Sequence, residues 1–165
     1  MKPLDLNRIN DRAPYHVNLT EDGYEFETEH GIHYVVSFDP EDILGGMLAY
    51  WFNLSNRNNK TSPNDKKVRL NIIIIIEEFF RDNPNILLYI CDNANNQQAM
   101  RSRLFSHWFN SYQFQEEYYA RTEMVRDEGE ENYISIIVKR THPQLLDIIE
   151  TFDKQIAMFK SYKPQ

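Results

Sequence analysis

Five consecutive isoleucines, Ile72–Ile76, are the feature that most constrains the fold of this chain. Isoleucine is β-branched and by itself prefers strands. The flanking residues nevertheless favour a helix, because apolar residues recur at the i, i+4, i+7, i+8 and i+11 positions of one helical stripe. Asn83-Pro84 ends the pattern, since the residue before a proline disfavours helical backbone. The predicted stripe consists of Val68, Ile72, Ile75, Ile76 and Phe79.

The start of this helix is predicted at "SPND", with Ser62 as the N-cap, Pro63 at the first helical position and Asp65 in the first turn. Polar residues at the remaining positions predict a side of the helix that faces solvent. They are Asn71, Glu77, Glu78, Arg81 and Asp82.

The segment that follows, "ILLYICD", is apolar at nearly every position. Strands of this kind are usually central in a sheet and covered on both faces. Because a long helix separates it from the aromatic segment "MLAYWFNLS", we expect the two segments to be parallel strands joined by a crossover.

The remaining patterns predict two hairpins and two further helices. Alternation in "YEFETEHGIHYVVSF" predicts the first hairpin, and "EEYYARTEMV" with "NYISIIVKR" predicts the second. One helix is predicted over residues 96–112. Another is predicted to begin at a capping box formed by Thr141 and Gln144. Its apolar stripe contains Leu145, Ile148, Ile149, Phe152, Ile156 and Phe159.

The element order β-β-β-α-β-α-β-β-α predicts a single α+β domain over residues 21–165, preceded by an N-terminal arm or loop over residues 1–20. We expect a mixed, largely antiparallel sheet of about six strands with three helices.

Charge and cysteine content limit the classes of protein. The chain has 165 residues and a net charge of −7, which disfavours nucleic-acid and membrane-surface binding. A single cysteine forms no internal disulfide, and the N-terminus has no apolar signal region, so we expect a cytoplasmic protein. Its longest aliphatic run is far shorter than the ~20 residues of a membrane span.

Two phrases resemble a known family. "LLYICDNANNQQAMRSRLFSHWF" and the preceding "EEFFRDNPN" look like an uncharacterised bacterial family of unknown function, found mainly in Bacteroidetes. The resemblance covers roughly residues 20 to 140 and implies no activity.

The order of elements also resembles the acetyl-CoA-dependent N-acetyltransferase superfamily. This resemblance implies an N-acetyltransferase-like topology, with acyl-CoA lying between "MLAYWFNLS" and "ILLYICD". It also implies that the pyrophosphate binds at the N-terminus of the intervening helix, where the helix dipole favours an anion.

Candidate binding residues follow the central strand. Asp92 ends that strand, where open sheets tend to bind ligands, with a turn or cap role as the alternative. Arg103 and His107 share a face of the next helix and could meet a phosphate, or simply line a solvated face; Arg101 lies well round from them. Trp51 could line a cleft or a dimer face, with a core position as the alternative.

A candidate anion-binding site lies at the start of the isoleucine-rich helix, where Lys66, Lys67 and Arg69 gather near Lys60. Cations there are mildly unfavourable, so we expect compensating charge, for example from the acidic stretch 123–131 of another chain. We expect no metal site, because His30 and His33 straddle a turn and no Cys/His cluster has ligand spacing.

The sequence therefore favours a non-catalytic interaction or regulatory module that acts through a protein partner or as a homo-dimer, with no cofactor. The alternative is a diverged acyl-CoA-dependent N-acetyltransferase-like enzyme that binds acetyl-CoA or CoA. The sequence leaves open whether the protein is an enzyme.

Overall fold

The five isoleucines are helical. They lie in α2 (Lys66–Arg81) of the computed structural model, which describes residues 1–165 except 43–45, 59, 61–63, 82–83, 92–106 and 162–165. All five are buried, as are Val68 and Phe79 of the predicted stripe. The strand predicted to follow is β5 (Ile86–Cys91), which lies between β4 and β7 in the sheet. Both predictions are confirmed.

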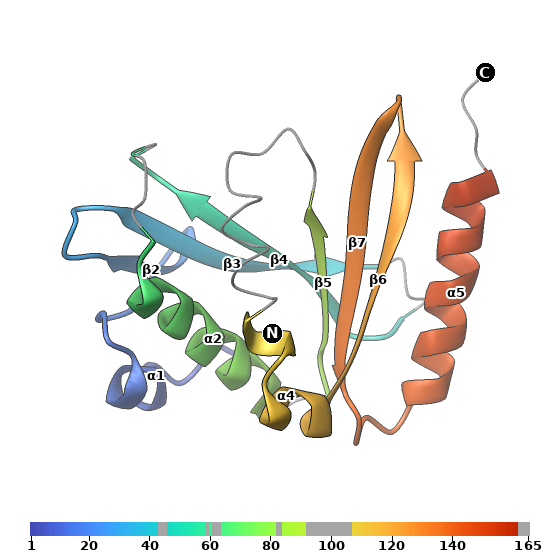
Figure 1. The fold of residues 1–165 in the computed structure, drawn as a ribbon. Helices are drawn as coiled ribbons and strands as arrows, with labels where there is room; N and C mark the ends of the chain where they lie inside the picture. The colour runs from blue at the N-terminus through green and yellow to red at the C-terminus, as the bar shows by residue number, and fades with distance from the viewer. Residues whose placement is uncertain (43–45, 59, 61–63, 82–83, 92–106, 162–165) are drawn as a thin grey trace. The chain divides into compact units, whose positions relative to one another are not determined.

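Among the described residues, seven strands are hydrogen-bonded in the order β1-β2-β3-β4-β5-β7-β6 (Figure 1). β4 and β5 pair in parallel, whereas the β1-β2, β2-β3, β5-β7 and β6-β7 pairs are antiparallel. The α+β class and the mixed, mostly antiparallel sheet are therefore confirmed, with seven strands instead of about six. The other strands are β1 (Asn18–Thr20), β2 (Gly23–Glu27), β3 (His33–Glu41), β4 (Ala49–Asn56), β6 (Tyr118–Asp127) and β7 (Glu130–Lys139).

Two compact units can be distinguished along the chain. The first comprises residues 1–38 and 52–83, and the second comprises residues 39–51 and 84–165. The core of the first unit is largely aromatic. Phe38 stacks on Phe79 with ring centroids 4.5 Å apart, and Phe26 lies 5.5 Å from Tyr34. No helix in the described part of the chain combines the length and the apolar character needed to span a bilayer.

The N-terminal segment predicted as an arm or loop contains helix α1 (Leu6–Arg12) and strand β1. Asp5 caps α1 by accepting the Arg8 N–H, and Ile9 is fully buried. Arg12 pairs with Glu77 of α2 at 3.1 Å. The loop prediction was wrong because so short a helix shows too few apolar residues for its period to be read, although one buried isoleucine docks it.

Asn71 of α2 lies inside the protein, whereas the sequence predicted it on the solvent-facing side. Its Oδ1 accepts the backbone N–H of Tyr15 at 2.8 Å, and its Nδ2 donates to the backbone carbonyl of Tyr15 at 3.0 Å. The amide therefore satisfies both polar groups of one buried peptide segment. This explains why a polar residue interrupts an apolar surface, since buried backbone groups need partners.

The predicted helix starts differ from the observed ones. α2 begins at Lys66, and Asn64 and Asp65 are not helical, so the N-cap predicted at Ser62 was wrong. α5 (Leu145–Ser161) begins without the predicted capping box of Thr141. Instead, the Nδ1 atom of buried His142 accepts the Gln144 N–H at 3.0 Å, and its Nε2 lies 3.0 Å from the carbonyl of Pro84. At α2 the acceptor is Asp65, whose Oδ1 accepts the Lys67 N–H. At both helices the side chain that accepts therefore lies nearer the helix than the predicted cap.

The helix predicted over residues 96–112 ends earlier in the described part. Residues 107–109 are helical, and Ser111 then caps a separate short helix, α4 (Tyr112–Glu117), by accepting the Phe114 N–H. The prediction missed this break because the apolar side chains on both sides of it pack together. Trp108 contacts the Phe114 ring at 4.6 Å.

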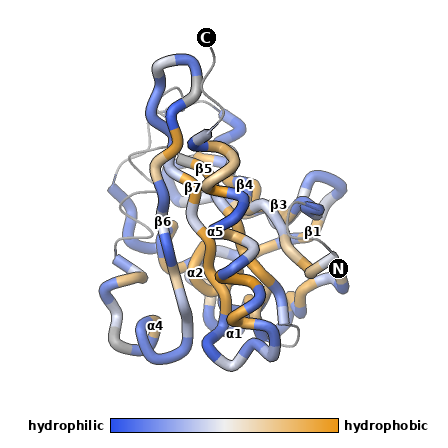
Figure 2. Tube along the Cα trace, turned by 90° about the vertical axis from the view of Figure 1, so that its right-hand side faces the viewer, coloured by the Kyte–Doolittle hydropathy of each residue, from blue (hydrophilic) through white to orange (hydrophobic). Residues whose placement is uncertain are grey.

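In the second unit, α5 packs on one face of β5, β7 and β6 (Figure 1). Figure 2 shows hydrophobic and hydrophilic segments alternating along α5, as expected for a helix with one buried stripe. Buried Ile148, Phe152 and Ile156 form that stripe. At its margin Arg121 pairs with Asp153, and Arg121 and then Lys160 lower the pKa of Glu123.

We expect Asn71→Ala to destabilise the protein by about 2–4 kcal/mol, because it leaves two buried backbone groups of Tyr15 without partners. Urea unfolding followed by circular dichroism would measure the loss. Leu70→Ala, at an exposed neighbouring position of α2, is the control and should change stability by less than about 0.5 kcal/mol. Equal effects of the two substitutions would contradict a specific role for the Asn71 amide.

Candidate functional site

The turn between β2 and β3 presents the side chains of Glu29 and His30 to solvent. Buried Thr28 holds the turn, because its hydroxyl accepts the N–H groups of His30 and Ile32, each at 3.2 Å. Gly31 adopts a left-handed conformation with φ of 73°, which a glycine takes without strain. The turn is therefore fixed by its backbone, and the side chains of Glu29 and His30 are left exposed.

Asp65 lies directly before α2 and is held by two hydrogen bonds. Its Oδ1 accepts the backbone N–H of Lys67 at 2.9 Å, which caps the helix. Its Oδ2 accepts the hydroxyl of Tyr15 at 2.6 Å. The carboxylate is thus oriented by the helix start and by a residue fifty positions earlier.

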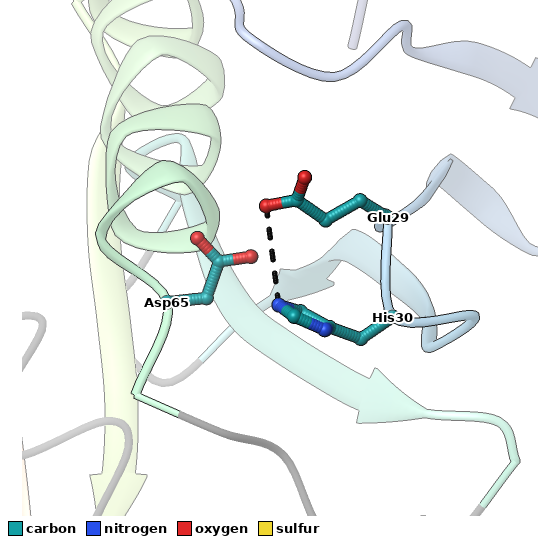
Figure 3. Close-up of side chains that lie close together, drawn as sticks. All are labelled: Glu29, His30 and Asp65. Atoms are coloured by element: carbon teal, nitrogen blue, oxygen red, sulfur yellow. Dashed lines mark ion pairs between the residues drawn. The ribbon is translucent and has the colours of Figure 1, made fainter.

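These two segments bring Glu29, His30 and Asp65 together, and we refer to them as the turn–helix cluster (Figure 3). One nitrogen or oxygen atom from each lies within 4.8 Å of the others. The His30 Nε2 lies 3.9 Å from the Glu29 Oε1. Lys67 also reaches the cluster, with its Nζ 3.6 Å from the Glu29 Oε1 and 5.9 Å from the Tyr15 ring centroid.

The environment of Tyr15 stabilises its neutral form. Burial, followed by the hydrogen bond to the Asp65 carboxylate, raises the pKa of Tyr15 to about 12. An ionised phenolate would lose this bond and face a carboxylate. Tyr15 therefore acts as a hydrogen-bond donor that fixes Asp65.

The turn–helix cluster can act in two chemical ways. As observed, the Glu29 carboxylate pairs with Lys67 at 3.6 Å and lies 3.9 Å from the His30 Nε2, with Asp65 beside them. The same atoms, one imidazole nitrogen and two carboxylate oxygens, are also ligands that divalent transition metals accept. Lys67 competes with such an ion for Glu29.

The predicted anion-binding residues lie beside this cluster. The compensation expected from another chain is provided by the same chain, because Glu29 pairs with Lys67. Arg69 donates to the side-chain oxygen of Asn64 at 3.4 Å. Lys66 is exposed and makes no ion pair with any residue that the structure describes. Of the three, Lys66 has the ammonium most available to an anion.

The other predicted site residues lie in the second unit. Trp51 is partly buried against the hydrophobic core between α5 and the sheet. Its indole N–H donates to the carboxylate of Glu41. His107 is exposed. Asp92, Arg101 and Arg103 lie outside the described residues, so the geometry predicted for them stays a prediction.

Sequence reasoning identified His30 and Asp65 separately and did not join them. It compared His30 with His33, three positions away, whereas the observed neighbour of His30 is Asp65, 35 positions away. His33 instead lies 3.5 Å from Glu25. The sequence feature that pointed to acidic side chains near Asp65 was the set of lysines at the start of α2, because cations at a helix N-terminus favour nearby negative charge.

We expect Tyr15→Phe to lose less stability than the wild type at alkaline pH. Because the folded pKa of Tyr15, about 12, exceeds the unfolded value of about 10, its contribution is complete below pH 10. That contribution then declines as the pH rises towards 12. Urea unfolding between pH 8 and about 12 would measure the difference. Parallel curves for the two proteins would contradict it.

Comparison with known proteins gives one match. A family model described as "Family of unknown function (DUF6169)" matches residues 64–154, more than half of the chain. The matched range begins at Asn64, just before α2, and includes Asp65, but not Glu29 or His30. No curated protein and no solved structure matches the chain.

Proposed function

This chain belongs to the family of unknown function DUF6169, and since that description assigns no activity, we propose its function from its surface chemistry. We propose that the protein is a non-catalytic interaction module that binds a basic surface of another protein. The contact is made by the acidic tip of the β6–β7 hairpin, residues 126–131, which we call the hairpin tip.

The form of the hairpin tip is the observation that carries this proposal. The last pair between β5 and β7 in the described chain joins Cys91 to Tyr133, whereas β6 and β7 pair further, as far as Asp127 with Glu130. The tip therefore extends past the paired part of β5 (Figure 1). Residues 128–130 at the end of this extension are exposed in the described part of the chain.

The turn of the hairpin tip has a defined conformation. Glu128 and Gly129 have φ angles of 52° and 81°, as in a type I′ turn. The side chains of Glu128 and Glu130 are exposed, and Glu131 lies 3.3 Å from Arg126. A turn with a defined conformation presents these charges with less ordering of the chain on binding.

Charge favours a basic protein as the partner over a nucleic acid or an anionic membrane. The net charge of −7 repels phosphates and attracts cationic surfaces. Complementary charge of this kind mainly raises the association rate and selects the partner. Another protein and a second copy of this chain, through exposed Lys66, both fit this chemistry.

The test reverses the charge of the hairpin tip. We expect Glu128→Lys/Glu130→Lys to abolish partner capture by the immobilised protein and any self-association measured by light scattering. High salt should have the same effect on the wild type, because the Debye length falls to about 3 Å at 1 M. Glu21→Lys/Glu150→Lys, with the same change of charge at other exposed positions, is the control.

Two outcomes would contradict the proposal. One is a wild type that stays monomeric and captures nothing at low salt. The other is a tip variant that retains the same partners as the control variant.

A second candidate function is a diverged acyl-CoA-dependent N-acetyltransferase-like enzyme. The parallel pairing of β4 with β5, on either side of α2 in the sequence, favours it, because it matches the strand–helix–strand order of that superfamily. The pyrophosphate would bind at exposed Lys66. This candidate ranks second because "NKTSPNDKKVR" contains no glycine that would let backbone approach a phosphate.

Thermal unfolding with acetyl-CoA or CoA tests the second candidate. A ligand at 100 times its Kd should stabilise the protein by about 2.7 kcal/mol. Lys66→Glu should remove this shift, and Lys154→Glu on α5 should retain it. The absence of any shift at millimolar CoA would contradict acyl-CoA binding.

A further inference from the structure

We propose that the turn–helix cluster of Glu29, His30 and Asp65 is a binding site for a divalent transition-metal ion of the Zn²⁺ class. The ion displaces the ammonium of Lys67 from Glu29 and links the β2–β3 turn to the start of α2. This inference is independent of the hairpin tip, because the two sites share no residue.

The ligand types select the class of metal. Zn²⁺ accepts an imidazole nitrogen together with carboxylate oxygens, and three protein ligands leave one position for water. Ca²⁺ takes about six to eight oxygen ligands, and Mg²⁺ takes an octahedron of oxygens, so an imidazole is a poor ligand for either. The cluster therefore discriminates against the abundant hard cations.

The distances need only a small adjustment. Ligand atoms about 2.1 Å from a tetrahedral Zn²⁺ lie roughly 3.4 Å apart. The His30 Nε2 and the Glu29 Oε1 are 3.9 Å apart, and all three ligand atoms lie within 4.8 Å. The side chains of His30 and Glu29 are 48% and 56% exposed, so they are free to close the difference.

Asp65 supplies the fixed ligand. Hydrogen bonds from Tyr15 and from the Lys67 backbone hold its carboxylate, and each of its oxygens has a further lone pair for a metal. Metal-binding carboxylates typically have such outer hydrogen bonds, which fix the ligand before the ion arrives. The turn held by Thr28 orients the other two ligands from their backbone side.

Lys67 shows that the cluster already attracts a cation. Its ammonium lies 3.6 Å from the Glu29 Oε1 and is itself 54% exposed. It can therefore swing into solvent when a doubly charged ion takes its place. A competing internal cation also makes a specific prediction, because removing it should strengthen metal binding.

The first experiment titrates Zn²⁺ into the untagged, chelator-treated Cys91→Ser protein by calorimetry, so that neither a tag nor the thiol binds the ion. We expect one site per chain. His30→Ala should weaken it by about tenfold or more, because losing a direct ligand costs at least as much as losing an outer partner. His33→Ala, which removes the neighbouring histidine outside the cluster, should leave the affinity unchanged.

The second experiment removes the competing charge. Lys67→Met should raise the Zn²⁺ affinity by about three- to tenfold, and Lys66→Met should change it less. Circular dichroism would confirm that each variant is folded. The proposal is overturned if the wild type binds no Zn²⁺, if His33→Ala weakens binding as much as His30→Ala, or if Lys67→Met fails to strengthen it.

Discussion

The burial of helix α2 is the constraint on which the first unit depends. Eight of its apolar side chains and the amide of Asn71 are buried, so the helix is enclosed on most sides. Burying one such isoleucine contributes about 1.5–3 kcal/mol. The Asn71 amide then pairs the backbone of Tyr15, which couples the N-terminal segment to the helix. An exposed strand of five isoleucines would instead be prone to aggregation.

The chemistry at the start of α2 follows from this packing. Because the helix is held, Asp65 has a defined position, and the Tyr15 segment paired with Asn71 also delivers a hydroxyl to that carboxylate. The helix-capping interaction and the turn–helix cluster thus share one residue. The N-terminal end of a helix leaves backbone N–H groups that need acceptors, and here the Asp65 carboxylate that accepts the Lys67 N–H also belongs to the turn–helix cluster.

The hairpin tip is built on a different principle. Its charges lie on a turn fixed by local backbone conformation, and they depend little on the core of the second unit. Substitutions of exposed side chains at such a position usually change stability by less than about 0.5 kcal/mol. The two proposed sites are therefore separable by mutation.

Local patterns in the sequence determined the type of most elements: the α2 stripe, the apolar β5, both hairpins and the burial of α5 along Ile148, Phe152 and Ile156. These follow from periods of 3.6 and 2, which neighbouring residues define. Only the tertiary structure decided that Asn71 is buried, that α1 is a helix, and that Asp65 joins Glu29 and His30. Each of these depends on a partner distant along the chain, and no periodicity encodes which distant groups meet when a core closes.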